Sequence, residues 1–278
     1  MRPALLAFVC ALLLAATPLA AREQSDAPDI EILGFSPDGR YFAYEQYGYD
    51  IASDATDAAI FVIDRETNKA VDGFPFGFIA DQPDNPNKPD IDIETLRTEE
   101  GAPEIGKLRK MVREEAAAKL SALEIGTQGR RLAGVPMTQR SPVDGKDAPL
   151  KFTVWPTIPS AIPDQQLVYA IWAKTADPLP DCVNAAPEPR DIPVTFTIAA
   201  ERTFPETKTV ATKEHIYQWP IAKDDCPAGL WISDIIAPPD TKGEKPVLTV
   251  VFLTGAWSSA IDSARYHATF IEMPDTPE

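Results

Sequence analysis

The turn Ser36-Pro37-Asp38-Gly39 constrains the fold of this chain more than any other feature. Its proline presets φ at the first corner, and its glycine supplies a backbone that can take φ > 0. An apolar run at 30–35 precedes the turn and an aromatic-rich run at 41–47 follows it, which predicts a β-hairpin. Two more apolar runs, at 59–64 and 69–74, continue the pattern. The four runs together predict one four-stranded antiparallel unit.

The middle of the chain predicts one helix. Between Pro103 and Gly126, apolar residues recur every three or four positions, which is typical of an amphipathic helix at about 103–125. We expect Pro103 in its first turn and Gly126 at its end. Its polar side, which includes Arg109 and Arg113, is expected to face solvent.

The remaining chain predicts short strands, between which the 28 prolines concentrate. These strands are expected at 131–136, 150–155, 166–172, 194–199, 216–221, 230–236, 247–253 and 266–273. The runs at 167–172 and 247–253 are apolar on both faces, which predicts central strands. The predicted fold class is mainly β (α+β), with antiparallel sheets arranged as a sandwich or open barrel and one amphipathic helix on a side or edge.

Two resemblances begin at the same turn. Residues 35–39, 41–44 and 60–64 resemble a single blade of the TolB-type β-propellers, whose repeats carry FSPDG, an alanine-containing strand and an IYVID-like strand. No second clear copy follows, so a closed propeller is not predicted. Through residues 34–48, 60–64 and 247–270, the chain is also similar to a bacterial family of predicted secreted proteins of unknown function with an N-terminal GFSPDGRYFAFEEYG-like motif. This resemblance implies where the protein is located and how it folds. It assigns no catalytic or binding residue.

The sequence divides into four segments. Residues 1–21 combine a basic start, an apolar stretch and small residues at Ala20 and Ala21, which predicts a signal peptide. The others are an N-terminal blade-like β unit with an acidic loop (22–95), a helical segment (96–128) and a C-terminal β-rich region (129–278), which could share one domain with the N-terminal unit. Because no later apolar run is long enough to span a membrane, we expect a soluble secreted protein, located in the bacterial periplasm.

Two cysteines, Cys182 and Cys226, follow the predicted signal peptide. An even pair in an exported protein predicts one disulfide bond, which would close a loop of about 45 residues and stabilise the fold by about 4 kcal/mol. Two buried thiols are the alternative. The CxxC spacing of redox motifs and zinc knuckles is absent.

The net charge of −16 narrows the classes of partner. A chain this acidic repels phosphate backbones, which argues against nucleic acid, and it gains nothing from anionic lipid. A solvated acidic surface that keeps an exported protein in solution is the favoured interpretation.

Motifs for catalysis are missing from the sequence. Ser36 lies between Gly34 and Gly39 like a hydrolase nucleophile, but the next residue, Pro37, has no N–H for an oxyanion hole. Glycine-rich phosphate loops are absent, and no cofactor is predicted. The two histidines, His215 and His267, have no zinc-ligand spacing, and we expect His267 at the surface.

An acidic loop is the candidate metal site. Asp81, Asp84, Asp90 and Asp92 offer hard oxygen ligands for calcium, but their spacing does not match an EF-hand, and a solvated loop is favoured. The candidate binding residues are Tyr41, Tyr47 and Tyr49, because exposed aromatic rings could stack on sugars or grip a peptide. Core packing is the alternative for these rings.

We therefore expect a non-enzymatic binding or interaction module of the cell envelope, with an envelope protein or a small ligand as its partner. One alternative is a hydrolase of envelope polymers that uses carboxylates or His215. The other is a calcium-stabilised structural protein. The sequence leaves the oligomeric state open.

Overall fold

The structure is a computed structural model that describes residues 28–50, 55–79, 84–98, 103–134, 150–154, 167–175, 194–204, 209–219, 226–239, 247–257 and 262–274. The predicted signal peptide, Asp81 and Cys182 lie outside the described residues, and the predicted Cys182–Cys226 bond therefore does too. Within them the chain is mainly β, with antiparallel sheets and one α-helix, which confirms the predicted fold class.

The N-terminal sheet contains the hairpin expected at the Ser36–Gly39 turn. Its strands are β1 (Asp29–Phe35), β2 (Tyr41–Asp50), β3 (Ala55–Asp64), β4 (Lys69–Ala70) and β5 (Phe76–Phe78). Strands β1 to β4 are consecutive antiparallel neighbours, and β5 also pairs with β3. The sheet has five strands, so the prediction of four, with the last at 69–74, is wrong. Strand β4 ends early because the chain turns at Gly73, which has φ +82°.

Two glycines allow close backbone approach in this sheet. Gly34 has φ +116°, and a Cβ there would lie 2.7 Å from the carbonyl oxygen of Thr127. The neighbouring Phe35 N–H donates to that same oxygen at 2.8 Å, which ties the segment after the helix to β1. Gly77 has φ +133°, and a Cβ there would lie 2.2 Å from the carbonyl oxygen of Ala58. Any larger residue would push these segments apart.

Helix α2 (Ile105–Ala122) buries the predicted apolar stripe, including Leu108, Val112 and Ala116. The helix confirms the one predicted at about 103–125, and it is two residues shorter at its start and three at its end. Pro103 forms an isolated bridge with Arg97 before the helix begins.

At the other end of α2, Glu124 takes the left-handed conformation, with φ +54°. Its N–H donates to Ser121, and the N–H of Ile125 donates to Leu120, each at 3.0 Å. This is a Schellman motif, and both Leu120 and Ile125 pack on the core. This motif ends the helix at Ala122, four residues before Gly126.

The other strands form two four-stranded antiparallel sheets. The central sheet has the order β13 (Asp262–Glu272), β12 (Val247–Trp257), β11 (Cys226–Ala237) and β6 (Arg130–Gly134). The outer sheet has the order β10 (Thr209–Trp219), β9 (Val194–Phe204), β8 (Leu167–Thr175) and β7 (Leu150–Val154). Every strand predicted after the helix is present, and β8 and β12 have a neighbour on both sides, as predicted.

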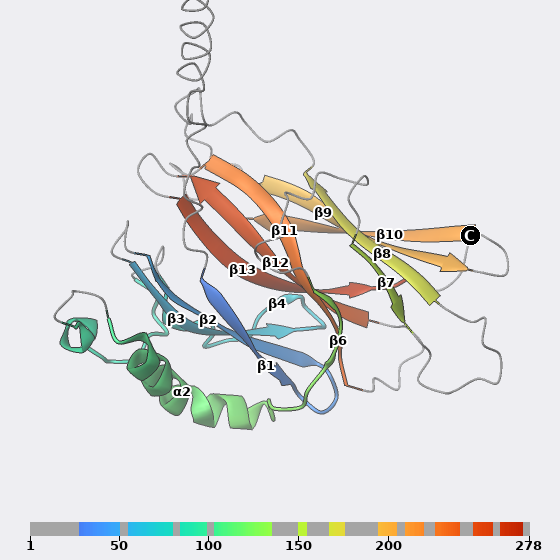
Figure 1. The fold of residues 1–278 in the computed structure, drawn as a ribbon. Coiled ribbons are helices and arrows are strands. Elements are labelled where there is room, and N and C mark those ends of the chain that lie inside the picture. Colours follow the sequence, from blue (N-terminus) through green and yellow to red (C-terminus); the bar gives the residue numbers. More distant parts are fainter. Residues whose placement is uncertain are drawn as a thin grey trace, which may run out of the picture.

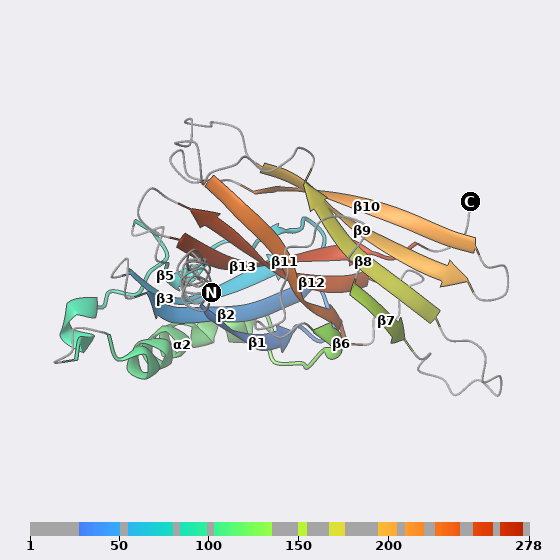
Figure 2. The same cartoon turned by 45° about the horizontal axis from the view of Figure 1, so that its top comes forward.

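The three sheets and α2 stack as four layers, with the central sheet between the other two (Figures 1 and 2). The apolar run in β12 explains this arrangement, because successive residues of a strand point to opposite faces. Val250 packs against the outer sheet, and Val251 packs against the N-terminal sheet. The far face of the N-terminal sheet packs against α2 through residues such as Ala43 and Ile60.

Candidate functional site

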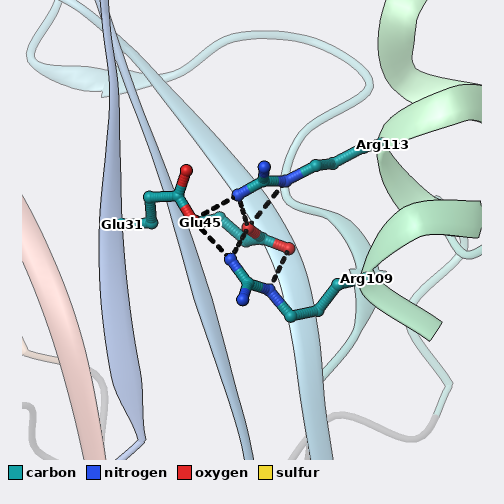
Figure 3. Close-up of polar contacts among 4 residues, drawn as sticks. All are labelled: Glu31, Glu45, Arg109 and Arg113. Carbon is teal, nitrogen blue, oxygen red and sulfur yellow. Dashed lines mark hydrogen bonds and ion pairs between the residues drawn. The ribbon is translucent and has the colours of Figure 1, made fainter. Parts of the chain in front are cut away.

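Two acidic side chains lie opposite each other on the face of the N-terminal sheet that α2 covers. Glu31 of β1 and Glu45 of β2 are direct partners in the antiparallel register. Arg109 and Arg113 lie four residues apart on α2, so they project from the same side of the helix. Figure 3 shows their guanidinium groups gathered around the two carboxylates. We call these four residues the Glu–Arg cluster.

Both oxygens of Glu45 accept hydrogen bonds in this cluster. Arg109 donates from Nε to Oε1 at 3.2 Å and from Nη2 to Oε2 at 2.8 Å. Arg113 donates from Nε to Oε2 at 2.9 Å and from Nη2 to the same oxygen. Oε2 of Glu31 lies 2.5 Å from Nη2 of Arg109 and 2.7 Å from Nη2 of Arg113. The Arg109 guanidinium also lies 3.3 Å from the ring centroid of Tyr47.

The arginines are needed because the two carboxylates repel each other. The side chain of Glu45 is completely buried, whereas that of Glu31 is 45% exposed. Like charges directly opposite on neighbouring strands are destabilising, and a buried charge without a partner is costly. The hydrogen bond from Arg113 lowers the pKa of Glu31 below its ordinary value of 4.5. The hydrogen bonds to Glu45 raise the pKa of Arg109, which favours the charged form of this guanidinium.

This geometry fits a structural brace better than an acid–base site. Glycoside hydrolysis needs one carboxylic acid that holds a proton to donate. The pKa of Glu31 is lowered, which favours its carboxylate form. Glu45 accepts hydrogen bonds from two guanidinium groups, and these have no lone pair with which to accept a hydrogen bond from a carboxylic acid. The cluster therefore joins α2 to β1 and β2 through charge-assisted hydrogen bonds.

The expectation that Arg109 and Arg113 face solvent is wrong. Their side chains are 21% and 37% exposed, and both turn toward the sheet. The sequence did contain a signal for this contact. Glu31 and Glu45 interrupt otherwise apolar or aromatic runs, and such residues need cationic partners if their strands are covered.

The three candidate tyrosines occupy alternate positions of β2, so they share its helix-facing side with Glu45. Tyr47 stacks under Arg109, which covers one face of its ring. Tyr49 lies two residues further along the strand. Tyr41 lies at the other end of β2, packs on the helix-side core and has the Arg40 guanidinium 5.1 Å from its ring centroid. Tyr47 and Tyr49 therefore share one end of this strand face, and Tyr41 lies at the other end.

The Ser36–Gly39 turn is closed by its own hydrogen bonds. Ser36 Oγ donates to Asp38 at 2.5 Å and accepts from the Tyr41 N–H at 2.9 Å. Gly39 takes φ +66°, and its N–H donates to the Ser36 carbonyl at 2.9 Å. The hydroxyl of Ser36 is therefore used within the turn, in line with a structural role.

The described part of the acidic loop is organised by side chain to backbone bonds. Asn85 is buried and donates to the carbonyl of Gly77 at 2.8 Å. Asp92 accepts from the Glu94 N–H at 3.1 Å and caps the 3-10 helix η1 (Ile93–Leu96). Asp84 and Asp90 are exposed. Among the residues that the structure describes, no group of three or more acidic, histidine or cysteine side chains is placed to hold a metal ion.

His267 lies between the central and outer sheets, so the expectation of a surface position is wrong. Its Nδ1 lies 3.3 Å from Tyr217 Oη, and its Nε2 lies 2.9 Å from Thr254 Oγ1. Because Thr254 donates onward to the Arg265 carbonyl at 3.4 Å, a neutral imidazole with its proton on Nε2 fits every contact. Burial lowers the pKa of His267 to about 3 and raises that of Tyr217 to about 12. His267 and Tyr217 are half-buried and Thr254 is buried, so this network is suited to fixing two sheets together.

His215, the histidine considered for catalysis, lies on β10 and contacts the end of β13. Its Nε2 is 3.2 Å from the Glu272 carbonyl oxygen, and burial lowers its pKa. Lys213, on the same face of β10, forms an ion pair with the Glu272 carboxylate. His215 therefore lies in the contact between the outer and central sheets.

The outer edge of β13 is covered by side chains of the N-terminal sheet. Tyr44 Oη donates to the Tyr266 carbonyl at 3.0 Å, and Gln46 accepts from the Tyr266 N–H at 2.7 Å. Asn68 donates to the Phe270 carbonyl at 3.0 Å and accepts from its N–H at 2.9 Å. These bonds occupy backbone groups that would otherwise be open to another strand.

The edge of the outer sheet at β10 is different. Strand β10 pairs with β9 on one side, and no described strand pairs with it on the other (Figure 2). Within the described residues, the large hydrophobic side chains exposed to solvent are Val210 and Ile216, at 53% and 75%, and both belong to β10. They alternate with Lys213 and His215, which face the central sheet, so they project from the opposite face.

Comparison with known proteins adds no family to these observations. No family model matches the chain, and no curated protein matches it significantly. None of the helices in the described segments is long and apolar enough to cross a membrane.

Proposed function

We propose that this chain is an exported, non-enzymatic interaction module of the bacterial cell envelope, and that it binds another protein chain along the outer edge of β10. The observation that carries the proposal is the pair of exposed side chains on this edge, Val210 and Ile216. A long edge strand with exposed apolar side chains is the usual template for adding a further strand. Backbone hydrogen bonds would supply affinity, and the two apolar side chains would supply selectivity.

The internal polar groups support binding over chemistry. In the Glu–Arg cluster, the carboxylates are neutralised by Arg109 and Arg113. In the His267 network, both ring nitrogens contact hydroxyl groups enclosed between sheets. Groups whose hydrogen-bonding capacity is used in this way hold layers together and present a rigid edge to a partner.

Export is the second part of the proposal. It is supported by the signal-like composition of residues 1–21 and by the resemblance of residues 34–48 to a family of predicted secreted proteins. Expression of the full chain in a bacterium, followed by fractionation and N-terminal sequencing, tests it. The mature protein should appear in the periplasmic fraction and begin after Ala20 or Ala21. An uncleaved chain in the cytoplasm would contradict export.

The binding part is tested by affinity isolation from gently crosslinked envelope extract, with the wild-type protein and an Ile216→Glu variant as baits. A partner of this edge should be recovered by the wild type and lost with the variant. The purified partner should then bind the wild type at least about tenfold more tightly than the variant, because the introduced carboxylate would be desolvated. Equal binding by the two baits would contradict a docking role for β10.

A further inference from the structure

We propose that a second copy of this chain pairs with β10, strand against antiparallel strand, about a twofold axis that passes Lys213. This inference rests on the docking edge of the proposed function and names its occupant. The four-stranded outer sheets of the two copies would then continue into each other.

The positions of the exposed side chains select this register. In an antiparallel pair of identical strands centred on Lys213, the residue n places before it lies opposite the residue n places after it. Val210 lies three residues before Lys213 and Ile216 lies three residues after it. Each Val210 would therefore lie opposite Ile216 of the second copy, and the pair would occur twice. Directly opposite residues share one face of a sheet, so both pairs would lie on the outward face, where these side chains already point.

The remaining positions are compatible with the same register. On the outward face, Thr212 would lie opposite Glu214, a hydroxyl against a carboxylate. On the inward face, Ala211 would lie opposite His215, a small side chain against a larger one. Lys213 would meet its own copy across the axis. Its charge is already balanced by the ion pair with Glu272 of its own chain, which reduces the repulsion.

The size and charge of this interface predict a weak dimer. One strand edge with two apolar pairs falls at the small end of protein interfaces, where transient association is usual. Each full chain carries a net charge of −16, so two copies repel each other, and added salt screens this repulsion. Dimerisation should therefore strengthen as the ionic strength rises. This salt dependence is opposite to that of a basic partner, whose attraction to the acidic chain would weaken.

The test uses analytical ultracentrifugation of the mature protein from about 10 µM to about 1 mM, at low and high salt. The wild type should show a monomer–dimer equilibrium that shifts toward dimer in high salt. Val210→Lys and Ile216→Glu should each weaken dimerisation about tenfold, because each removes both apolar pairs. The double variant Val210→Lys/Ile216→Glu should restore it, because this register places each new ammonium opposite a new carboxylate of the second copy.

Within one chain, positions 210 and 216 are six residues apart on a strand, about 20 Å, so the two charges cannot compensate each other inside a monomer. Lys110→Glu on the exposed side of α2 is the matched control, and it should leave dimerisation unchanged. Melting temperatures should agree among the variants, which separates association from folding.

Two results would overturn the inference. A wild type that stays monomeric at the highest concentration would do so, as would a double variant that dimerises no better than either single variant. If the affinity isolation recovers no envelope partner, that result counts against the proposed function alone, because the dimer is measured with the pure protein. A monomeric protein that still binds an envelope partner through β10 would refute the second copy and leave the proposed function standing.

Discussion

Replacing Arg109 with methionine should destabilise the fold more than the same change at Arg113, the other arginine of the Glu–Arg cluster. Within the described residues, Oε1 of Glu45 accepts only from Arg109, so the variant leaves a fully buried carboxylate oxygen without its donor. Removing one partner of a buried ion pair typically costs about 3–5 kcal/mol. Domains have about 5–15 kcal/mol of stability, so the loss would be a large fraction of the total. Methionine keeps much of the aliphatic stem that packs beside Tyr47.

Arg113→Met should cost less, about 1–3 kcal/mol. Both oxygens of Glu45 would still accept from Arg109, at 3.2 and 2.8 Å. Lys110→Met is the matched control on the same helix. Lys110 is 73% exposed, and its only ion pair in the described region is a 3.8 Å contact with Glu114. Its removal should change stability by less than about 0.5 kcal/mol.

Urea unfolding followed by circular dichroism measures these differences. A second substitution tests the electrostatic argument: Glu31→Gln should recover part of the loss in the Arg109→Met background, because it removes the carboxylate opposite Glu45. If Arg109→Met were no more destabilising than Lys110→Met, the brace would be refuted. If Glu31→Gln made the Arg109→Met variant still less stable, the repulsion argument would fail.

The pH dependence of the same cluster has a defined sign. The folded state lowers the pKa of Glu31 below 4.5, so its contribution is complete above the unfolded value and is lost as the pH falls through the lower folded value. The stability difference between the wild type and Glu31→Gln should therefore shrink in acid below about pH 4.

Three further predictions concern other parts of the fold. The pKa of His267 falls to about 3 from an ordinary value of 6.5, so this residue should cost the wild type up to about 1.4 kcal/mol per pH unit between those values, and His267→Gln should show a smaller slope in urea unfolding at pH 7, 6 and 5, with the lowered pKa of His215 still contributing. Glu124→Gly should raise the melting temperature, because glycine takes the φ of +54° without strain, worth about 0.5–1 kcal/mol. Asn68→Ala should accelerate hydrogen exchange at the Phe270 amide more than at the Tyr266 amide, because only the former loses its acceptor.

The strand content could be predicted from local patterns, whereas the stacking of sheets could not. Alternating and continuous apolar runs indicate which residues are buried. The run at 247–253, which is apolar on both faces, predicts that β12 is a central strand, as it is. Nothing local says which sheet covers each face, because that depends on contacts such as Val251 with the N-terminal sheet, far away in sequence. The short strand β5 was missed because three residues around Gly77 carry too little periodicity.

The candidate site shows the same division between local and long-range information. Arg109 and Arg113 border the apolar stripe of α2 closely enough to turn either way, and only the position of Glu45 on β2 decides the direction. The sequence favours a surface position for His267 because it shares a strand face with Thr269. The position is enclosed because Tyr217 of the outer sheet lies over it. Side chains at the border of a buried face are the ones that sequence reasoning places least well.

The layer order also separates a covered edge at β13 from an edge with exposed apolar side chains at β10. An N-terminal sheet that only packed on one face of the central sheet would leave the edge of β13 open. Here Tyr44, Gln46 and Asn68 reach that edge and occupy its backbone groups, while α2 is held on the opposite side by the Glu–Arg cluster. The N-terminal sheet thus covers both a face and an edge of the central sheet. In the described residues, the outer sheet packs on the central sheet through one face, and its edge strand β10 carries the exposed Val210 and Ile216. In the described part of the chain, side chains therefore cover the β13 edge of the central sheet, whereas the β10 edge of the outer sheet carries exposed apolar side chains of the kind that favour pairing with another strand.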